Sequence, residues 1–224
     1  MADIIEVKAG IEAENDRYAA EVRELLHIHK IFLINLMASP GAGKTSVLLQ
    51  TIDRLKKKYR IAVLEADVDA DIDAKAVEAH GVKALQVHTG GSCHMDARMT
   101  LDALKALDLK KYDIIFLENV GNLVCPAEFD VGQDIRVMIL SVPEGDDKPL
   151  KYPLMFQVSD CLLINKIDTD EIFDFDLQKL TTYVQPLNPG IKIIPVSAES
   201  GSGFESWIVW LEEHMQMIRK RIDG

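Results

Sequence analysis

The feature that most constrains this chain is a glycine-containing segment between an apolar run and a helical pattern. The run at residues 31–37 predicts a buried strand, and Ala38-Ser-Pro-Gly41-Ala-Gly43-Lys44-Thr45 leads from it into a helix expected over residues 44–58. A strand, a glycine loop and a helix in this order form the setting in which backbone N–H groups bind phosphate. The order therefore predicts a P-loop nucleotide-binding fold.

The residue types of this loop each suit a phosphate site. Glycine at positions 41 and 43 lets the backbone approach phosphate oxygens. The Lys44 ammonium can neutralise β- and γ-phosphate charge, and the Thr45 hydroxyl can ligate Mg²⁺. Ala38 stands where the first glycine of such loops usually lies, which an extended backbone tolerates and a positive φ would not. The expected phosphate-binding residues are Gly41, Ala42, Gly43, Lys44, Thr45 and Ser46.

A second motif, Asn165-Lys166-Ile167-Asp168, follows the apolar run at residues 161–164 and bears on the choice of base. A carboxylate accepts hydrogen bonds from the N1–H and the 2-amino group of guanine, whereas adenine offers the wrong donor pattern. Asp168 therefore predicts guanine nucleotides, with Asn165 and Lys166 in the same pocket. Ser197 and Ala198 are expected to complete this pocket through backbone contacts, although a helix N-cap is equally consistent with the pair.

Acidic residues follow two further apolar runs and are candidates for the magnesium site. Glu118 ends the run at residues 114–117, where the acid that supports Mg²⁺ usually lies, and Asp67 is the preferred partner after the run at 61–64. With Lys44, these two are the expected catalytic residues. A solvated acidic face explains Asp69 and Asp71 better, and Asp73 is open to either interpretation.

The alternation of apolar runs and helical patterns predicts an α/β fold with a mostly parallel sheet and helices on both faces. Residues 1–30 form an expected N-terminal amphipathic helix segment, and residues 31–224 form the expected P-loop GTPase domain. The segment 143–153 is expected to be an irregular connector or functional loop. The other expected strands lie at 84–87, 137–142 and 193–196, and the other expected helices at 70–80, 96–107, 176–184 and 204–221.

Composition narrows the range of partners. The formal net charge is −11 and the pI is about 5.0, which disfavours nucleic acid and anionic membranes as partners because their phosphates would be repelled. The most apolar stretch is far shorter than the roughly 20 residues of a membrane-spanning helix. The acidic start of the chain does not resemble a signal peptide, so we expect a cytoplasmic protein.

Two cysteines and a histidine form a candidate metal site. Cys93 and His94 lie in a glycine-rich loop, and Cys125 follows the segment after Glu118, so both loops should leave the same edge of the sheet. Two thiolates and an imidazole suit Zn²⁺ or Ni²⁺, and a second subunit could supply a fourth ligand. Spacing alone leaves open an unrelated pair of thiols. Cys161 begins an apolar run and is expected to be a core thiol.

Three motifs together resemble the HypB family of hydrogenase nickel-incorporation GTPases. They are Met37 to Thr45, Glu118-Asn-Val-Gly-Asn-Leu-Val-Cys-Pro126 and Asn165 to Asp168. The resemblance implies slow hydrolysis of GTP to GDP, GTP-dependent homodimerisation, and nickel or zinc at Cys93, His94 and Cys125. It also implies two protein partners, the nickel chaperone HypA and the hydrogenase large-subunit precursor. By the same resemblance Lys148 could reach the nucleotide of the other subunit.

This sequence departs from many bacterial members of that family, because residues 1–30 contain no cysteine and only two histidines. We therefore expect no nickel-storage function and no very tight nickel site within one chain. Two alternatives stay open: a metal-binding adaptor with a structural GTP site, and a nickel GTPase that serves another metalloenzyme such as urease.

Overall fold

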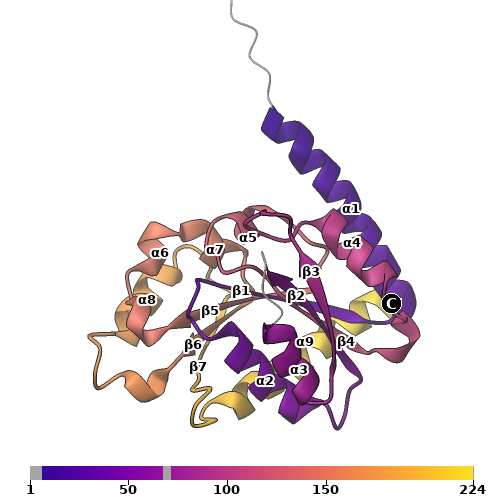
Figure 1. Ribbon diagram of the computed structural model, residues 1–224. Helices are drawn as coiled ribbons and strands as arrows, with labels where there is room; N and C mark the ends of the chain where they lie inside the picture. The colour runs from indigo at the N-terminus through magenta and orange to yellow at the C-terminus, as the bar shows by residue number, and fades with distance from the viewer. Residues whose placement is uncertain (1–6, 68–71, 224) are drawn as a thin grey trace, which may run out of the picture.

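Parallel strands form one seven-stranded sheet in the computed structural model, which describes residues 7–67 and 72–223 (Figure 1). The strand order is β3-β2-β4-β1-β5-β6-β7. The strands are β1 (Phe32–Ala38), β2 (Ile61–Asp67), β3 (Lys83–His88), β4 (Ile114–Glu118), β5 (Ile135–Ser141), β6 (Cys161–Asn165) and β7 (Lys192–Pro195). Every predicted strand is present, and all the observed neighbour pairs are parallel, in agreement with the predicted mostly parallel sheet.

The central strands are continuous apolar runs because helices cover both faces of the sheet. Every residue of β1, β4 and β6 is buried. Ala38 is the last residue of β1 and is fully buried, so the backbone there is extended and alanine can replace the usual glycine.

One face of the sheet is covered by α2 (Lys44–Leu55), α3 (Ile72–Ala79) and α9 (Phe204–Asp223). Their apolar side chains share one core with the strands. Within this core, the indole Nε1 of Trp207 donates to Thr51 Oγ1 at 3.0 Å, which ties α9 to α2. Figure 1 shows these helices together below the sheet.

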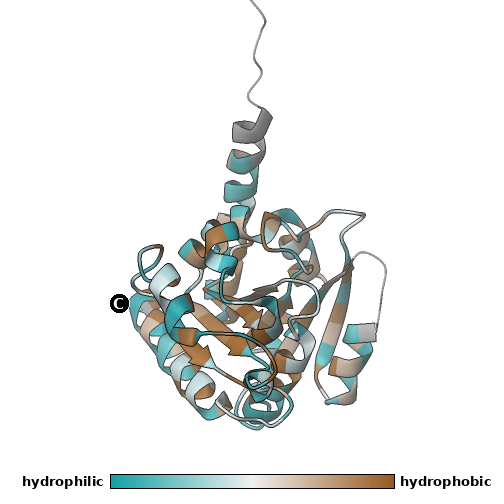
Figure 2. Cartoon of the chain, turned by 90° about the vertical axis from the view of Figure 1, so that its left-hand side faces the viewer, coloured by the Kyte–Doolittle hydropathy of each residue, from teal (hydrophilic) through white to brown (hydrophobic). Residues whose placement is uncertain are grey.

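The opposite face carries the remaining α-helices of the described chain, which pack over two further apolar clusters. Figure 2 shows the apolar residues concentrated in the strands that lie between the helical layers. These helices are α1 (Val7–His29), α4 (Ala97–Lys105), α5 (Cys125–Glu128), α6 (Lys148–Lys151), α7 (Pro153–Val158) and α8 (Leu177–Val184). Short 3-10 turns cover Leu109–Lys111, Val142–Glu144 and Ile167–Thr169.

The N-terminal helix α1 is confirmed, and it packs mainly on α4 (Figure 1). Val22 and Leu26 are fully buried on its inner side, whereas its first turns extend beyond the body of the molecule. Lys30 follows α1 with a φ of 58°, and β1 begins at Phe32. No described helix combines the length and apolar character needed to cross a membrane.

The segment 143–153 is more regular than the sequence predicts. Val142–Glu144 forms a 3-10 turn and Lys148–Lys151 forms α6, so the expectation of an irregular loop is wrong. Buried Asp146 anchors the segment, because it accepts from Lys179 Nζ at 2.9 Å and from the backbone N of Asp176 at 3.1 Å. Of the charged residues that suggested an exposed loop, Asp146 is therefore a buried anchor, whereas Asp147 and Lys151 form an exposed ion pair.

A candidate nucleotide and metal site

The P-loop joins β1 to α2 through two glycines in the left-handed region. Gly41 has φ 80° and Gly43 has φ 92°, and Gly43 is the N-cap of α2. The first N–H groups of a helix have no acceptor within it, so they are available to phosphate oxygens. A Cβ on Gly43 would lie 2.5 Å from Asn165 Nδ2, so this position also requires glycine for space.

Thr45 and Glu118 meet where β4 lies beside β1. Thr45 Oγ1 donates to Glu118 Oε1 at 2.8 Å, and the Glu118 residue is only 5% exposed. A hydroxyl and a carboxylate at this distance form a fitting pair of oxygen ligands for Mg²⁺. Both predicted side chains are therefore together beside the P-loop, as the sequence led us to expect.

A polar cleft beside Lys44 contains two residues that the sequence reasoning missed. Glu65 on β2 and Gln86 on β3 line it together with Glu118 and Asp73. Glu65 pairs in register with Glu118 on one side and with Gln86 on the other, so the three side chains form a row across neighbouring strands. Polar residues inside otherwise apolar strands were the available signal.

The remaining candidate acids have different placements. Asp73 lies in the first turn of α3, is half-buried and lines the same cleft as Lys44. Asp67 is the last residue of β2, and Asp69 and Asp71 lie outside the described residues. The role of Asp67 as a magnesium ligand therefore stays a prediction. Asp73 lies where it could take the same role.

The second predicted motif is joined to the P-loop by hydrogen bonds. Asn165 Nδ2 donates to the carbonyl of Ala42 at 2.9 Å, and Lys166 Nζ donates to the carbonyl of Gly41 at 2.8 Å. Lys166 adopts a φ of 62°, which turns the chain away from β6 toward the loop. Both motifs therefore border one cleft, whose described lining is Gly43, Ser46, Asn165, Lys166, Asp168, Thr169, Ala198 and Glu199.

Asp168 is held at this cleft by Ser197. Ser197 Oγ donates to Asp168 Oδ1, and the backbone N of Ala198 donates to Asn165 Oδ1 at 3.1 Å. These contacts fix the carboxylate at the cleft that lies next to the phosphate loop. The arrangement suits a guanine base, with the Asp168 carboxylate as acceptor for its two N–H groups.

The predicted metal ligands come together from two loops. The ligand atoms of Cys93, His94 and Cys125 all lie within 4.8 Å of one another. The two sulfur atoms are 2.7 Å apart, and His94 Nδ1 is 3.8 Å from Cys93 Sγ. Two thiols and an imidazole fit a borderline-soft divalent ion such as Ni²⁺ or Zn²⁺, and three donors leave a coordination position open. Cys161, by contrast, is buried in the core as predicted.

Burial shapes the protonation of this triad. It raises the pKa of the Cys125 thiol, and the hydrogen bond with Cys93 acts in the same direction. Burial also lowers the pKa of His94, whose ring stacks on Phe129 with centroids 4.2 Å apart. At neutral pH the imidazole is therefore in its neutral, ligating form, whereas Cys125 must lose a proton to bind a metal ion.

The loop between Glu118 and Cys125 touches both sites. The backbone N of Asn122 donates to the Ala38 carbonyl at 2.9 Å, and a Cβ on Gly121 would lie 3.0–3.2 Å from atoms of Pro40. On its other side, Asn122 Nδ2 donates to the Cys93 carbonyl at 3.3 Å. A single loop is thus packed against the phosphate loop and bonded to the metal loop.

The comparison with known proteins decides the family. A model described as the CobW/HypB/UreG nucleotide-binding domain matches residues 32–195. Hydrogenase maturation factor HypB of Azotobacter vinelandii is 46% identical over 222 residues, which are 99% of this chain and 73% of that protein. The chain belongs to the HypB family. The predicted resemblance is thereby confirmed.

Solved HypB structures share the fold. The crystal structure of HypB from Helicobacter pylori in complex with nickel has 37% identity and a TM-score of 0.87, and the match covers 91% of this chain and 96% of that chain. HypB from Archaeoglobus fulgidus has 38% identity and a TM-score of 0.84 over 91% of this chain and 99% of that one. The α/β P-loop fold with an N-terminal helix is confirmed.

Proposed function

We propose that this chain is a GTP-hydrolysing metallochaperone switch that binds nickel or zinc and assists nickel insertion into hydrogenase through GTP-dependent dimerisation. The observation that carries the proposal is the loop between Glu118 and Cys125. Its first end is bonded to Thr45 of the P-loop and its second end carries a ligand of the metal triad. A change at the nucleotide can therefore alter the geometry of the metal site.

In the proposed nucleotide site, hydrolysis depends on positioning and charge neutralisation. The N–H groups of residues 41–46 and the Lys44 ammonium hold the phosphates, and Asp168 holds guanine. Thr45, Glu118 and Asp67 would hold Mg²⁺, which supplies positive charge to the β- and γ-phosphates. Phosphoryl transfer to water needs little covalent participation by the protein, so these residues are sufficient for hydrolysis. Slow turnover suits a switch.

The metal ion is cargo in this proposal. Cys93, His94 and Cys125 supply three donors, so a second copy of the chain completes the coordination or shares the ion. The homodimer places two triads near each other when GTP is bound, and Lys148, which begins α6, is the candidate contact to the nucleotide of the other subunit. HypA as metal donor and the hydrogenase large-subunit precursor as acceptor complete the proposed route.

Substitution of Lys44 tests whether the nucleotide site is catalytic. We expect Lys44→Ala to abolish GTP hydrolysis, because the ammonium that neutralises phosphate charge is lost, while circular dichroism shows a folded protein. Lys105→Ala is the control, since Lys105 is an exposed lysine in the last turn of α4. Phosphate release is measured for both variants.

Two outcomes contradict the proposal. Hydrolysis that survives Lys44→Ala would show that the observed turnover does not arise at this loop. A wild-type mass that is the same with GDP and with a non-hydrolysable GTP analogue would instead support a metal-binding adaptor whose GTP site is structural.

A further inference from the structure

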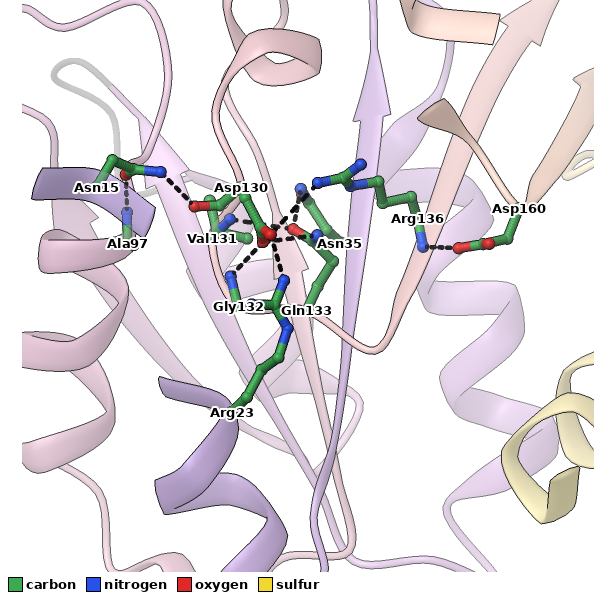
Figure 3. A network of polar contacts seen from close by, with 10 residues as sticks. All are labelled: Asn15, Arg23, Asn35, Ala97, Asp130, Val131, Gly132, Gln133, Arg136 and Asp160. Carbon is green, nitrogen blue, oxygen red and sulfur yellow. Dashed lines mark hydrogen bonds and ion pairs between the residues drawn. The ribbon is translucent and has the colours of Figure 1, made fainter. Parts of the chain in front are cut away.

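A buried asparagine of the N-terminal helix bonds to the backbone shortly after each of the two segments that carry the metal triad. Asn15 on α1 is 8% exposed. Its Oδ1 accepts from the backbone N of Ala97 at 3.0 Å, and its Nδ2 donates to the carbonyl of Asp130 at 2.8 Å (Figure 3). One side-chain amide therefore bridges two segments that are distant in the sequence.

These two segments bear the candidate metal ligands. Ala97 begins α4 shortly after His94, and Asp130 follows α5, which begins at Cys125. Between the two anchored points, the ring of His94 stacks on Phe129 with centroids 4.2 Å apart. Asn15 therefore holds the backbone at Ala97 and the backbone at Asp130 at a fixed distance. The contact between His94 and the Cys125 segment spans this same distance.

Other contacts hold the remaining sides of the same segments. Asn119 Oδ1 accepts from the backbone N of Met95 at 3.0 Å, so the 95–97 segment is bonded at both ends. The Asp130 carboxylate accepts from Arg23 of α1 and from the backbone N of Gly132 at 2.8 Å (Figure 3). Nearer the triad, Asn122 Nδ2 also joins the two loops through the Cys93 carbonyl at 3.3 Å, and Asn15 adds a second bridge on the α1 side.

The two hydrogen bonds of Asn15, more than its packing, explain why an asparagine lies at this position. Asparagine is a poor residue for a helix interior, and a buried amide is unfavourable unless its polar atoms are hydrogen-bonded. A residue needed only for packing between α1 and α4 would be served by alanine or leucine. Here both ends of the amide bond to backbone outside α1.

We propose that Asn15 is a positioning residue for the metal triad, setting the distance between the His94 segment and the Cys125 segment without touching the metal ion. The inference rests on the proposed metal binding by Cys93, His94 and Cys125. Groups that hydrogen-bond directly to metal ligands typically change affinity by about 10–100-fold when they are removed, and the low end of that range applies to Asn15 because it acts through the backbone next to the ligands. Asn15→Ala is therefore expected to weaken metal binding about tenfold.

The experiment measures Zn²⁺ and Ni²⁺ affinity, and the Co²⁺ absorption spectrum, for the full chain with Asn15→Ala. The thiolate-to-Co²⁺ bands should weaken or shift, while guanine-nucleotide affinity stays at the wild-type value. Asn188→Ala is the matched control, because Asn188 Nδ2 donates to the carbonyls of Phe156, Gln157 and Ser159, away from the triad. This control should lose stability and keep its metal affinity and spectrum.

Asn15→Asp provides a second variant of the same size, which retains an acceptor for Ala97 and loses the donor to Asp130. It should also weaken metal binding, by several-fold, even if the alanine variant does not fold. If the folded variants bind like the wild type and differ only in melting temperature, Asn15 is structural and the proposal is overturned. If the wild type itself binds no metal, the proposed metal function fails first.

Discussion

Replacing Gly43 with alanine tests whether the P-loop and the base-recognition motif form one unit. Gly43 has φ 92°, and an added Cβ would lie 2.5 Å from Asn165 Nδ2. Asn165 cannot stay in place, because contacts at that distance are strongly repulsive. Its displacement breaks the bonds to the Ala42 carbonyl at 2.9 Å and from the Ala198 backbone N at 3.1 Å.

The expected destabilisation follows from these contacts. A residue with a Cβ in the left-handed region costs roughly 1–2 kcal/mol. Each lost hydrogen bond costs about 1 kcal/mol. Gly43→Ala should therefore lower the free energy of unfolding by about 3–4 kcal/mol. The matched control is Gly81→Ala, since Gly81 has φ 79° and no atom within 4 Å of an added Cβ. Gly81→Ala should lower the free energy of unfolding only by the cost of the left-handed backbone conformation, about 1–2 kcal/mol.

Urea unfolding of the nucleotide-free protein measures both free energies, and binding of a fluorescent GDP analogue measures the site. Gly43→Ala should bind GDP at least about tenfold more weakly, a change of about 1.4 kcal/mol, whereas Gly81→Ala should bind as the wild type does. Equal destabilisation of the two variants, with unchanged GDP affinity, would refute the coupling between Gly43 and Asn165.

The remaining predictions concern base choice and metal chemistry. Asp168→Asn should move the preference from GTP toward xanthosine triphosphate, because an amide offers one donor and one acceptor where xanthine has a 2-oxo group and an N1–H. Competition binding measures the preference. If the variant still prefers GTP, Asp168 does not contact the base. Since burial raises the pKa of Cys125 and lowers that of His94, metal binding should release about one proton from Cys125, and affinity should fall as pH falls from 8 to about 6. Calorimetry in buffers of different ionisation enthalpy counts the protons, and Cys125→Ala should release about one proton fewer than the wild type and bind metal more weakly while remaining folded. Binding without proton release would contradict a thiol ligand.

The fold could be predicted because its main signals are local. Parallel strands buried on both faces give continuous apolar runs, and the glycines that follow β1 mark the phosphate loop within a few residues. The predicted metal ligands could be paired because Cys93 and Cys125 follow β3 and β4 on the same sheet edge. Their approach to within 2.7 Å depends on folded loops that spacing does not encode.

The missed features depend on contacts between distant segments. Helices α5 and α6 have four residues each and are too short to give a periodic pattern, and the turn residues and opposite charges around α6 suggested an irregular segment. Glu65 follows its apolar run just as Glu118 does, but Asp67 was preferred there, and the pairing of Glu65 with Glu118 follows only from the strand order. Asn15 is one polar residue among many in α1, and its partners Ala97 and Asp130 are identified only by the packing of α1 against both loops.

The most direct test of the central claim is the affinity of the wild type for Ni²⁺, measured by calorimetry with GDP and with a non-hydrolysable GTP analogue, together with mass by light scattering. If the loop from Glu118 to Cys125 couples the two sites, the analogue will produce a dimer and shift Ni²⁺ affinity several-fold relative to GDP. The same mass and the same affinity in both nucleotide states would contradict the coupled switch.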